Sequence, residues 1–200
     1  MDPFIAQLML GPQLSRFLKR FPGLKLEMIA RDRLGDLVAE GFDLAIRFGE
    51  PRPSTLVARK LLHTRVVTVA SPTYLKQAGR PTHPSELEKG NHRLIDFRDP
   101  ETGRAYEWVF RQGRKEIEIG SNAQLLLSDV ATIHAVCLAG YGIAQLLELG
   151  IESLIESGRL EVLFPGWLDE RFPLYALHPS RHHLPPKTRA FLDFVIATVK

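Results

Sequence analysis

Segments with helical periodicity alternate with segments of strand periodicity along the first seventy residues. Apolar residues from Ile5 to Phe21 recur at helical spacing with Pro12 as a break, and PGLKLEMIA then alternates apolar and polar residues as a strand does. DRLGDLVAEG is typical of a short amphipathic helix that ends at Gly41, with Val38 among its inward residues. FDLAIRF has the length of a strand, and STLVARKLLHTRVVTVAS suits a pair of strands. This order predicts an α/β lobe with helices packed on a sheet.

Turn-forming residues interrupt this pattern after Pro72, and a second set of elements follows. Ser85 and Glu88 have the spacing of a capping box for a short helix. RLIDF is typical of a strand, EWVFRQGRKEIEIG of a hairpin that turns at Gln112 and Gly113, and LEVLF and PLYALHP of two more strands. A final helix opens at the two prolines before KTRAFLDFV. We therefore expect two α/β lobes, the second inserted into the first.

Two glycines, Gly140 and Gly142, stand close together in CLAGYGIAQLL. A dinucleotide-binding turn has a strand before its glycines and a helix after them, so that phosphates meet the helix N-terminus. Here the order is reversed, because SDVATIHAVCLAG has helical spacing with Ser128 as N-cap and Gly140 as stop, and GIAQLL suits a short strand. The pattern predicts a compact helix-turn-strand unit. The N–H groups at the helix start, near Ser128 and Asp129, could face an anion.

The composition is that of a globular protein. The 200 residues are 44% hydrophobic and 24% charged, with no apolar run of about 18 residues and no secretory signal in MDPFIAQLML, so we expect a cytoplasmic protein outside the membrane. Cys137 is the single cysteine, which excludes an internal disulfide and a cysteine-based zinc site. The net charge is +3, but Lys and Arg are scattered among acidic residues, so we expect no direct contact of this chain with DNA.

No group of residues has the pattern of a catalytic or metal site. Cys137 falls on the buried side of its helix, where a thiol behaves as a small apolar group, and no G-x-S-x-G motif occurs. His178, His182 and His183 cluster after the last strand, where a solvated loop is favoured over metal binding. We expect no enzymatic activity, no cofactor and no metal.

A series of longer motifs covers nearly the whole chain. They are FLKRFPGLKLEM, DLVAEGFDLAIRFGE, LVARKLLHTRVVTVASPTYLKQAGRPTHPSEL, LAGYGIAQL, SGRLEVLFP and KTRAFLDFV. Taken in this order, they resemble the effector-binding (regulatory) domain of LysR-type transcriptional regulators. The match lacks the N-terminal winged helix-turn-helix of such regulators, so the resemblance implies a fragment that senses without binding DNA, with the first strand of the domain cut short.

The resemblance implies a fold and a set of partners. The fold is α/β, with two Rossmann-like lobes joined by two crossover strands, as in type 2 periplasmic binding proteins. Residues 1–70 and 173–200 would form lobe I, and residues 71–172 lobe II. A small organic effector would bind between the lobes, with an organic anion as the first expectation. Dimers would form when residues 7–20 of one subunit pack against residues 129–139 of another, with tetramers in the full-length protein, which would contact DNA only through its N-terminal domain.

The resemblance also places effector-binding residues in this sequence. They are Phe4, Ile5, Arg31, Arg47, Ser71, Phe97, Ser128, Gly142 and Ile143. Each has a structural alternative: Arg47 could pair with Asp43 or another carboxylate, Arg31 could be solvated, and Ser128 is in the first place an N-cap. Phe4, Phe97 and Ile143 could be plain core residues, although apolar walls with few polar groups are typical of small-molecule sites.

The function that follows is effector binding and dimerisation within a LysR-type regulator, with control of DNA binding through rearrangement of lobes and dimer. A free-standing solute-binding protein of a transporter shares the lobe layout and is the alternative. An upstream helix-turn-helix would support the regulator, and an upstream signal peptide would support the transporter protein.

Overall fold

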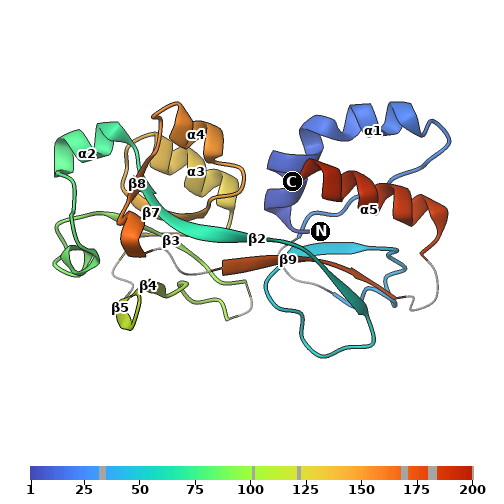
Figure 1. Ribbon diagram of the computed structural model, residues 1–200, viewed down its shortest axis with the longest axis horizontal. Coiled ribbons are helices and arrows are strands. Elements are labelled where there is room, and N and C mark those ends of the chain that lie inside the picture. Colours follow the sequence, from blue (N-terminus) through green and yellow to red (C-terminus); the bar gives the residue numbers. More distant parts are fainter. Residues whose placement is uncertain (32–34, 101, 121–122, 168–170, 180–183, 200) are drawn as a thin grey trace. The chain divides into compact units, whose positions relative to one another are not determined.

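The computed structural model divides the chain into two compact units (Figure 1). Unit 1 consists of Met1–His63 and Phe172–Lys200, and unit 2 of Thr64–Arg171. Among the described residues, no helix is long and apolar enough to cross a membrane. The residues that the structure describes are 1–31, 35–100, 102–120, 123–167, 171–179 and 184–199.

Unit 1 has a helical layer held together by phenylalanines. The ring centroid of Phe17 lies 4.6 Å from that of Phe194 and 5.5 Å from that of Phe191, which brings α1 and α5 side by side (Figure 1). The predicted break at Pro12 is confirmed as a short 3-10 turn that precedes α1. The helical elements are η1 (Ile5–Leu10, a π-helical turn), η2 (Gly11–Gln13), α1 (Leu14–Arg20) and α5 (Pro186–Thr198).

The sheet of unit 1 has β9 between β1 and β2. β1 is antiparallel to β9, with Ile46 opposite Ala176. Leu37, Tyr175 and Leu177 form a buried cluster on this sheet with Ala45. The strands are β1 (Ala45–Phe48), β2 (Val57–Ala70) and β9 (Arg171–His178).

The sheet of unit 2 has the order β2-β7-β3-β6, and β8 also pairs with β2. β3 is parallel to both of its neighbours, whereas β7 is antiparallel to β2. The strands other than β2 are β3 (Leu94–Phe97), β6 (Leu125–Leu127), β7 (Ile143–Leu147) and β8 (Glu161–Leu163). The helices are α2 (Pro72–Ala78), α3 (Val130–Leu138) and α4 (Glu152–Glu156).

Both faces of this sheet are buried, because successive residues of its strands enter different cores. Leu94 and Ile143 belong to a cluster with Trp108 and Phe110, whereas their neighbours Ile95 and Ala144 belong to a cluster with α3. The first cluster is covered by a hairpin that turns at Gly113, as the sequence predicted. The covering elements are η3 (Pro84–Leu87), β4 (Trp108–Gln112), β5 (Lys115–Ile119) and η4 (Pro165–Trp167).

Three predicted elements differ in the structure. STLVARKLLHTRVVTVAS forms one strand of 14 residues, β2, and no strand pair. The stretch 22–30 alternates half-buried and exposed residues from Leu24 to Ile29, but it has no assigned strand, since a strand also needs a hydrogen-bonded neighbour. Residues 37–41 form a turn where the predicted helix 32–41 would end, and residues 32–34 of that helix, with the predicted inward Leu34, lie outside the described residues. In this turn Leu37 is buried and Val38 is 58% exposed, so the inward placement of Val38 was wrong.

The capping box before Leu87 was placed two residues too late. His83, and not Ser85, caps the turn, because its imidazole accepts from the Ser85 N–H while the Glu86 carboxylate accepts from the His83 N–H. The pattern was correct in kind, but a histidine took the place of the expected hydroxyl.

Candidate functional site

Two parallel strands of unit 2 end at the same edge of the sheet. Phe97, the last residue of β3, is opposite Leu127, the last residue of β6, and the Arg98 N–H donates to the Leu127 carbonyl at 2.7 Å. Ser128 follows directly and leads into α3. The structure therefore brings Phe97 and Ser128 to the carboxyl edge of the sheet, where open α/β sheets bind ligands.

The N-cap of α3 is Asp129, which corrects the prediction of Ser128. The Asp129 carboxylate accepts from the Thr132 N–H at 2.8 Å and from the Thr132 hydroxyl at 2.5 Å. These hydrogen bonds, the one from the Thr132 side chain above all, hold the pKa of Asp129 below its ordinary value. The helix start already carries a carboxylate of the chain itself, which disfavours contact of an anion with the helix N–H groups, whereas the exposed Ser128 side chain lies outside this cap.

Three predicted residues lie at the opposite edge of the same sheet. Ile143 is opposite Leu94, the first residue of β3, and opposite Ala70, the last residue of β2. Ser71 and Gly142 adjoin these positions. The three steps along β3 from Leu94 to Phe97 span about 10 Å. The structure thus separates Ser71, Gly142 and Ile143 from Phe97 and Ser128.

These three residues have structural roles where they lie. Ser71 is 2% exposed, and its hydroxyl accepts from the Tyr74 N–H at 3.3 Å as the N-cap of α2. Ile143 is fully buried. A Cβ at Gly142 would lie 2.4 Å from the carbonyl oxygen of Arg93, so only glycine fits without a shift of that backbone.

The carboxyl edge also holds residues that the sequence analysis missed. Thr64, where the chain enters unit 2, is 7% exposed, and its hydroxyl accepts from the Leu149 N–H at 3.0 Å. Arg65 donates through Nε and Nη2 to the two carboxylate oxygens of Glu148, at 2.8 and 2.5 Å. β7 ends at Leu147. Glu148, the charged residue directly after the run IAQLL, therefore marks the end of this strand in the sequence, and it is the signal that would have located these residues.

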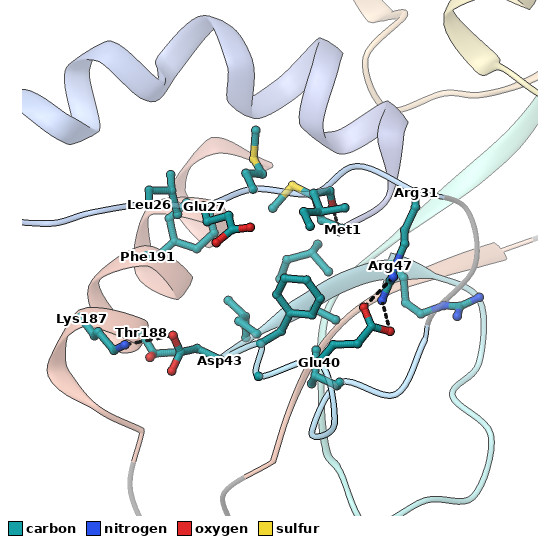
Figure 2. Close-up of a pocket in the computed structure, with 18 of the residues that line it drawn as sticks. Met1, Leu26, Glu27, Arg31, Glu40, Asp43, Arg47, Lys187, Thr188 and Phe191 are labelled. Atoms are coloured by element: carbon teal, nitrogen blue, oxygen red, sulfur yellow. Dashed lines mark hydrogen bonds and ion pairs between the residues drawn. The ribbon is translucent and has the colours of Figure 1, made fainter.

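Unit 1 has a pocket of about 750 Å³, which we call the unit 1 pocket (Figure 2). Arg31 and Arg47 both line it, so the structure brings these two predicted residues together. Phe4 and Ile5 are outside its lining and are 4% and 0% exposed. The N–H groups of Phe4 and Ile5 donate to the Asp2 carboxylate at 2.9 and 3.4 Å. Asp2, whose carboxylate accepts both hydrogen bonds at this helix start, is a further residue that the sequence analysis missed.

Ion pairs bind charged side chains at two sides of the unit 1 pocket. Arg31 pairs with Glu40 at 2.7 Å, and the hydrogen bond that its guanidinium donates to the Glu40 carboxylate raises the pKa of Arg31 (Figure 2). Lys187 pairs with Asp43 at 3.0 Å, so the carboxylate suggested as a partner of Arg47 is bonded to another cation. The Arg47 Nε donates to the Phe48 carbonyl at 3.5 Å.

Cys137 of unit 2 is not an activated nucleophile. Burial raises the pKa of the Cys137 thiol to about 12, and its sulfur lies 3.7 Å from the Gly142 carbonyl and 3.8 Å from the Val69 carbonyl. The described residues contain no group of three or more potential metal ligands. His178 ends β9, and His182 and His183 lie outside the described residues.

Comparisons with known proteins agree on one family. The family model of the LysR substrate binding domain matches residues 1–200. The HTH-type transcriptional regulator PtxR of Pseudomonas aeruginosa is 33% identical over 181 residues, which are 88% of this chain and 55% of that protein. The HTH-type transcriptional regulator YcaN of Escherichia coli K12 is 32% identical over 198 residues, 96% of this chain and 60% of that protein. This chain thus spans just over half of these curated relatives.

Solved structures give the same result. The regulatory domain of CrgA, a LysR-type transcriptional regulator from Neisseria meningitidis, matches with a TM-score of 0.86 and 26% identity, over 100% of this chain and 96% of that chain. Full-length CrgA matches with a TM-score of 0.87 and 26% identity, over 99% of this chain and 66% of that chain. Regulatory domains of this kind have the type 2 periplasmic-binding-protein-like fold, as the sequence analysis expected. The chain therefore belongs to the LysR substrate-binding domain family, the effector-binding domains of LysR-type transcriptional regulators.

Proposed function

We propose that this domain binds a small organic effector and thereby controls a transcriptional regulator of which it is the sensing part. The observation that carries the proposal is the match to the regulatory domain of CrgA, which covers the whole of this chain and nearly the whole of that domain. The relatives named above are regulators, which gives no support to the solute-binding protein of a transporter or to an enzyme. We place the domain in the cytoplasm, because transcription is controlled where the DNA is.

The nine predicted effector-binding residues have unequal support. Phe97 and Ser128 lie at the carboxyl edge of the unit 2 sheet, where ligands of α/β sheets bind, and are the strongest members. Arg47, which lines the unit 1 pocket, is the cationic contact that we propose for an organic anion. Thr64 joins the proposed set, because its hydroxyl belongs to the same edge as Phe97 and Ser128.

Regulation requires that the effector distinguish two states of the protein. A ligand that binds both states equally shifts neither, however tightly it binds. We propose that the states differ in the arrangement of lobes and dimer, and that DNA is contacted by another part of the regulator. Leu8 and Leu18 support a dimer contact through η1 and α1, because they are 37% and 38% exposed on these helices.

The proposal is tested by thermal-shift screening of small organic acids, with amines and neutral compounds of similar size as the comparison. We expect an acid that raises the melting temperature. The variants Arg47→Ala and Ser128→Ala should each weaken its binding about tenfold or more, which corresponds to about 1.4 kcal/mol. Arg159→Ala, at an exposed position, is the matched control and should bind normally. Unchanged affinity in both site variants would show that the residue assignment is wrong.

A further inference from the structure

Tyr74 of α2 is connected to the start of β3 through its hydroxyl group. Its side chain is 1% exposed, and the phenol oxygen accepts from the Arg93 N–H at 2.8 Å and lies 3.2 Å from Nδ1 of His92. Arg93 directly precedes β3, and its carbonyl accepts from the Ile143 N–H of β7 at 2.8 Å. The backbone of Arg93 therefore joins α2, β3 and β7 at the edge of the sheet opposite the carboxyl edge.

The hydrogen bonds of Tyr74 determine the protonation state of His92. A phenol has one hydrogen to donate, and it accepts through its oxygen. The Arg93 N–H uses this oxygen as an acceptor, so the hydroxyl hydrogen remains to be donated. Among the described residues, the other atom recorded within hydrogen-bonding distance is Nδ1 of His92. His92 must then be neutral, with its own hydrogen on Nε2.

Protonation of His92 removes the acceptor of this hydrogen bond. An imidazolium carries a hydrogen on both nitrogens, so Nδ1 becomes a donor. If the phenol oxygen accepts from it, the hydroxyl hydrogen of the buried Tyr74 has no acceptor, which is costly. The alternative is that His92, which is half-buried, turns toward solvent. In both cases the contact between Tyr74 and His92 is weakened.

Two effects on the pKa of His92 oppose each other. Burial lowers it, and the negative charge of Glu86 of η3 raises it by a smaller amount. The hydrogen bond from the Thr82 hydroxyl holds the pKa of Glu86 below its ordinary value, with further contributions from the N–H groups of Thr82 and His83 and from the charge of Lys89. Glu86 is therefore ionised throughout the range in which His92 titrates.

Arg93 is the other charged side chain at this contact. Its guanidinium carbon lies 5.7 Å from the ring centroid of Tyr74 and 5.0 Å from that of Tyr141. A guanidinium does not lose its proton in a protein, so this cation stays beside the two rings at any pH of interest. The part of the network that responds to acid is therefore the contact between the Tyr74 hydroxyl and the His92 imidazole.

We propose that the contact between Tyr74 and His92 is an acid-sensitive switch of unit 2, closed when His92 is neutral and opened by its protonation. Opening leaves the Arg93 N–H bonded to a hydroxyl that has lost its second partner, so the link between α2 and the start of β3 becomes weaker. The switch is closed above about pH 6.5 and opens as the pH falls through the lowered pKa of His92. This response to acid does not depend on the proposed effector.

The test measures hydrogen exchange of the Arg93 amide by NMR at about pH 7.5 and about pH 5.5. Intrinsic exchange rates change with pH, so the compared quantity is the protection factor, the ratio of the intrinsic to the observed rate. We expect the protection of Arg93 to fall about fivefold or more at the lower pH, as the weakening of one hydrogen bond predicts. The Gly79 N–H, which donates to the Leu75 carbonyl at 3.0 Å within α2, should keep its protection.

Three variants assign the effect to its residues. His92→Gln keeps an acceptor for the Tyr74 hydroxyl but does not titrate, so the protection of Arg93 should no longer depend on pH. Tyr74→Phe removes the acceptor of the Arg93 N–H, so its protection should be low at both pH values. The matched control is His83→Ser, which removes the other imidazole beside Glu86 but keeps a capping residue for η3. The pH dependence should persist in this control.

Persistence of the pH dependence in His92→Gln, or its loss in His83→Ser, would overturn the proposal. A joint loss of protection at Gly79 and Arg93 would also contradict it, because α2 would then unfold as a whole. NMR of the imidazole nitrogens in the unsubstituted protein gives a second measurement that requires no variant to fold. A hydrogen on Nε2 of neutral His92 supports the proposal, and a hydrogen on Nδ1 contradicts it, because Nδ1 could not accept from Tyr74.

Discussion

At the scale of single residues, the structure moved two predicted helix caps to neighbouring residues. Ser128 and Asp129 are both good N-caps, and the backbone of Asp129, with φ −103° and ψ 118°, has the extended conformation that a cap requires. The same happened before Leu87, where His83 caps in place of Ser85. Residue type narrows a helix start to a few positions, and the local backbone path selects one.

The cap of α3 gives a prediction at this scale. Asp129→Ala should lower the free energy of unfolding by about 1 kcal/mol, within a range of about 0.5 to 2, because the Thr132 N–H loses its acceptor. Ser128→Ala should change it by less than about 0.5 kcal/mol. Urea unfolding followed by circular dichroism measures both. A larger loss for the serine variant than for the aspartate variant would return the cap to Ser128.

At the scale of elements, strand formation depended on neighbours more than on pattern. Residues 24–29 have the alternation of a strand but no strand assignment, whereas β1, with the short sequence AIRF, pairs with β9. The helix-turn-strand unit from α3 to β7 was predicted correctly, because Gly140 has the positive φ of 86° that favours glycine after a helix. A glycine that ends a helix acts through its own backbone conformation, so the pattern can be recognised from the local sequence alone.

The close approach of β7 to the start of β3 gives a second prediction. Gly142→Ala should destabilise the domain by about 1 to 3 kcal/mol, because the new Cβ would lie 2.4 Å from a backbone oxygen of Arg93 that cannot rotate away. Gly120→Ala is the control, since nothing lies within 4 Å of its Cβ, and it should be neutral or stabilising by up to about 1 kcal/mol. Equal melting temperatures of the two variants in calorimetry would contradict the steric argument.

At the scale of the whole molecule, one buried and one half-buried histidine couple stability to pH. Burial lowers the pKa of His134, against a smaller opposing effect of Asp129, and burial likewise lowers the pKa of His92. Both should therefore have a lower pKa in the folded state than the value of about 6.5 in an unfolded chain. At a pH between the folded and the unfolded pKa, the unfolded state binds more protons than the folded state, so the free energy of unfolding rises with pH.

This sign gives the third prediction. Stability should be fully present above about pH 6.5 and should decrease as the pH falls through the lowered folded values. A tenfold difference in proton affinity between the folded and unfolded states corresponds to a loss of about 1.4 kcal/mol. Urea unfolding at pH 7.5 and pH 5.5 measures the loss. His134→Gln should reduce it, because the variant has no imidazole to protonate at this 7% exposed position. A loss of the same size in the variant would assign the pH dependence to other groups.

The sequence by itself determined the α/β class, the order of most elements and the family, because periodicity, glycine turns and ordered motifs are local properties. It placed Phe97 at the end of a strand and Ser128 at the start of a helix, but it could not tell that Ser71, Gly142 and Ile143 lie at the other edge of the same sheet. Only the tertiary structure decided this, because the direction and register of paired strands depend on residues far apart in the chain.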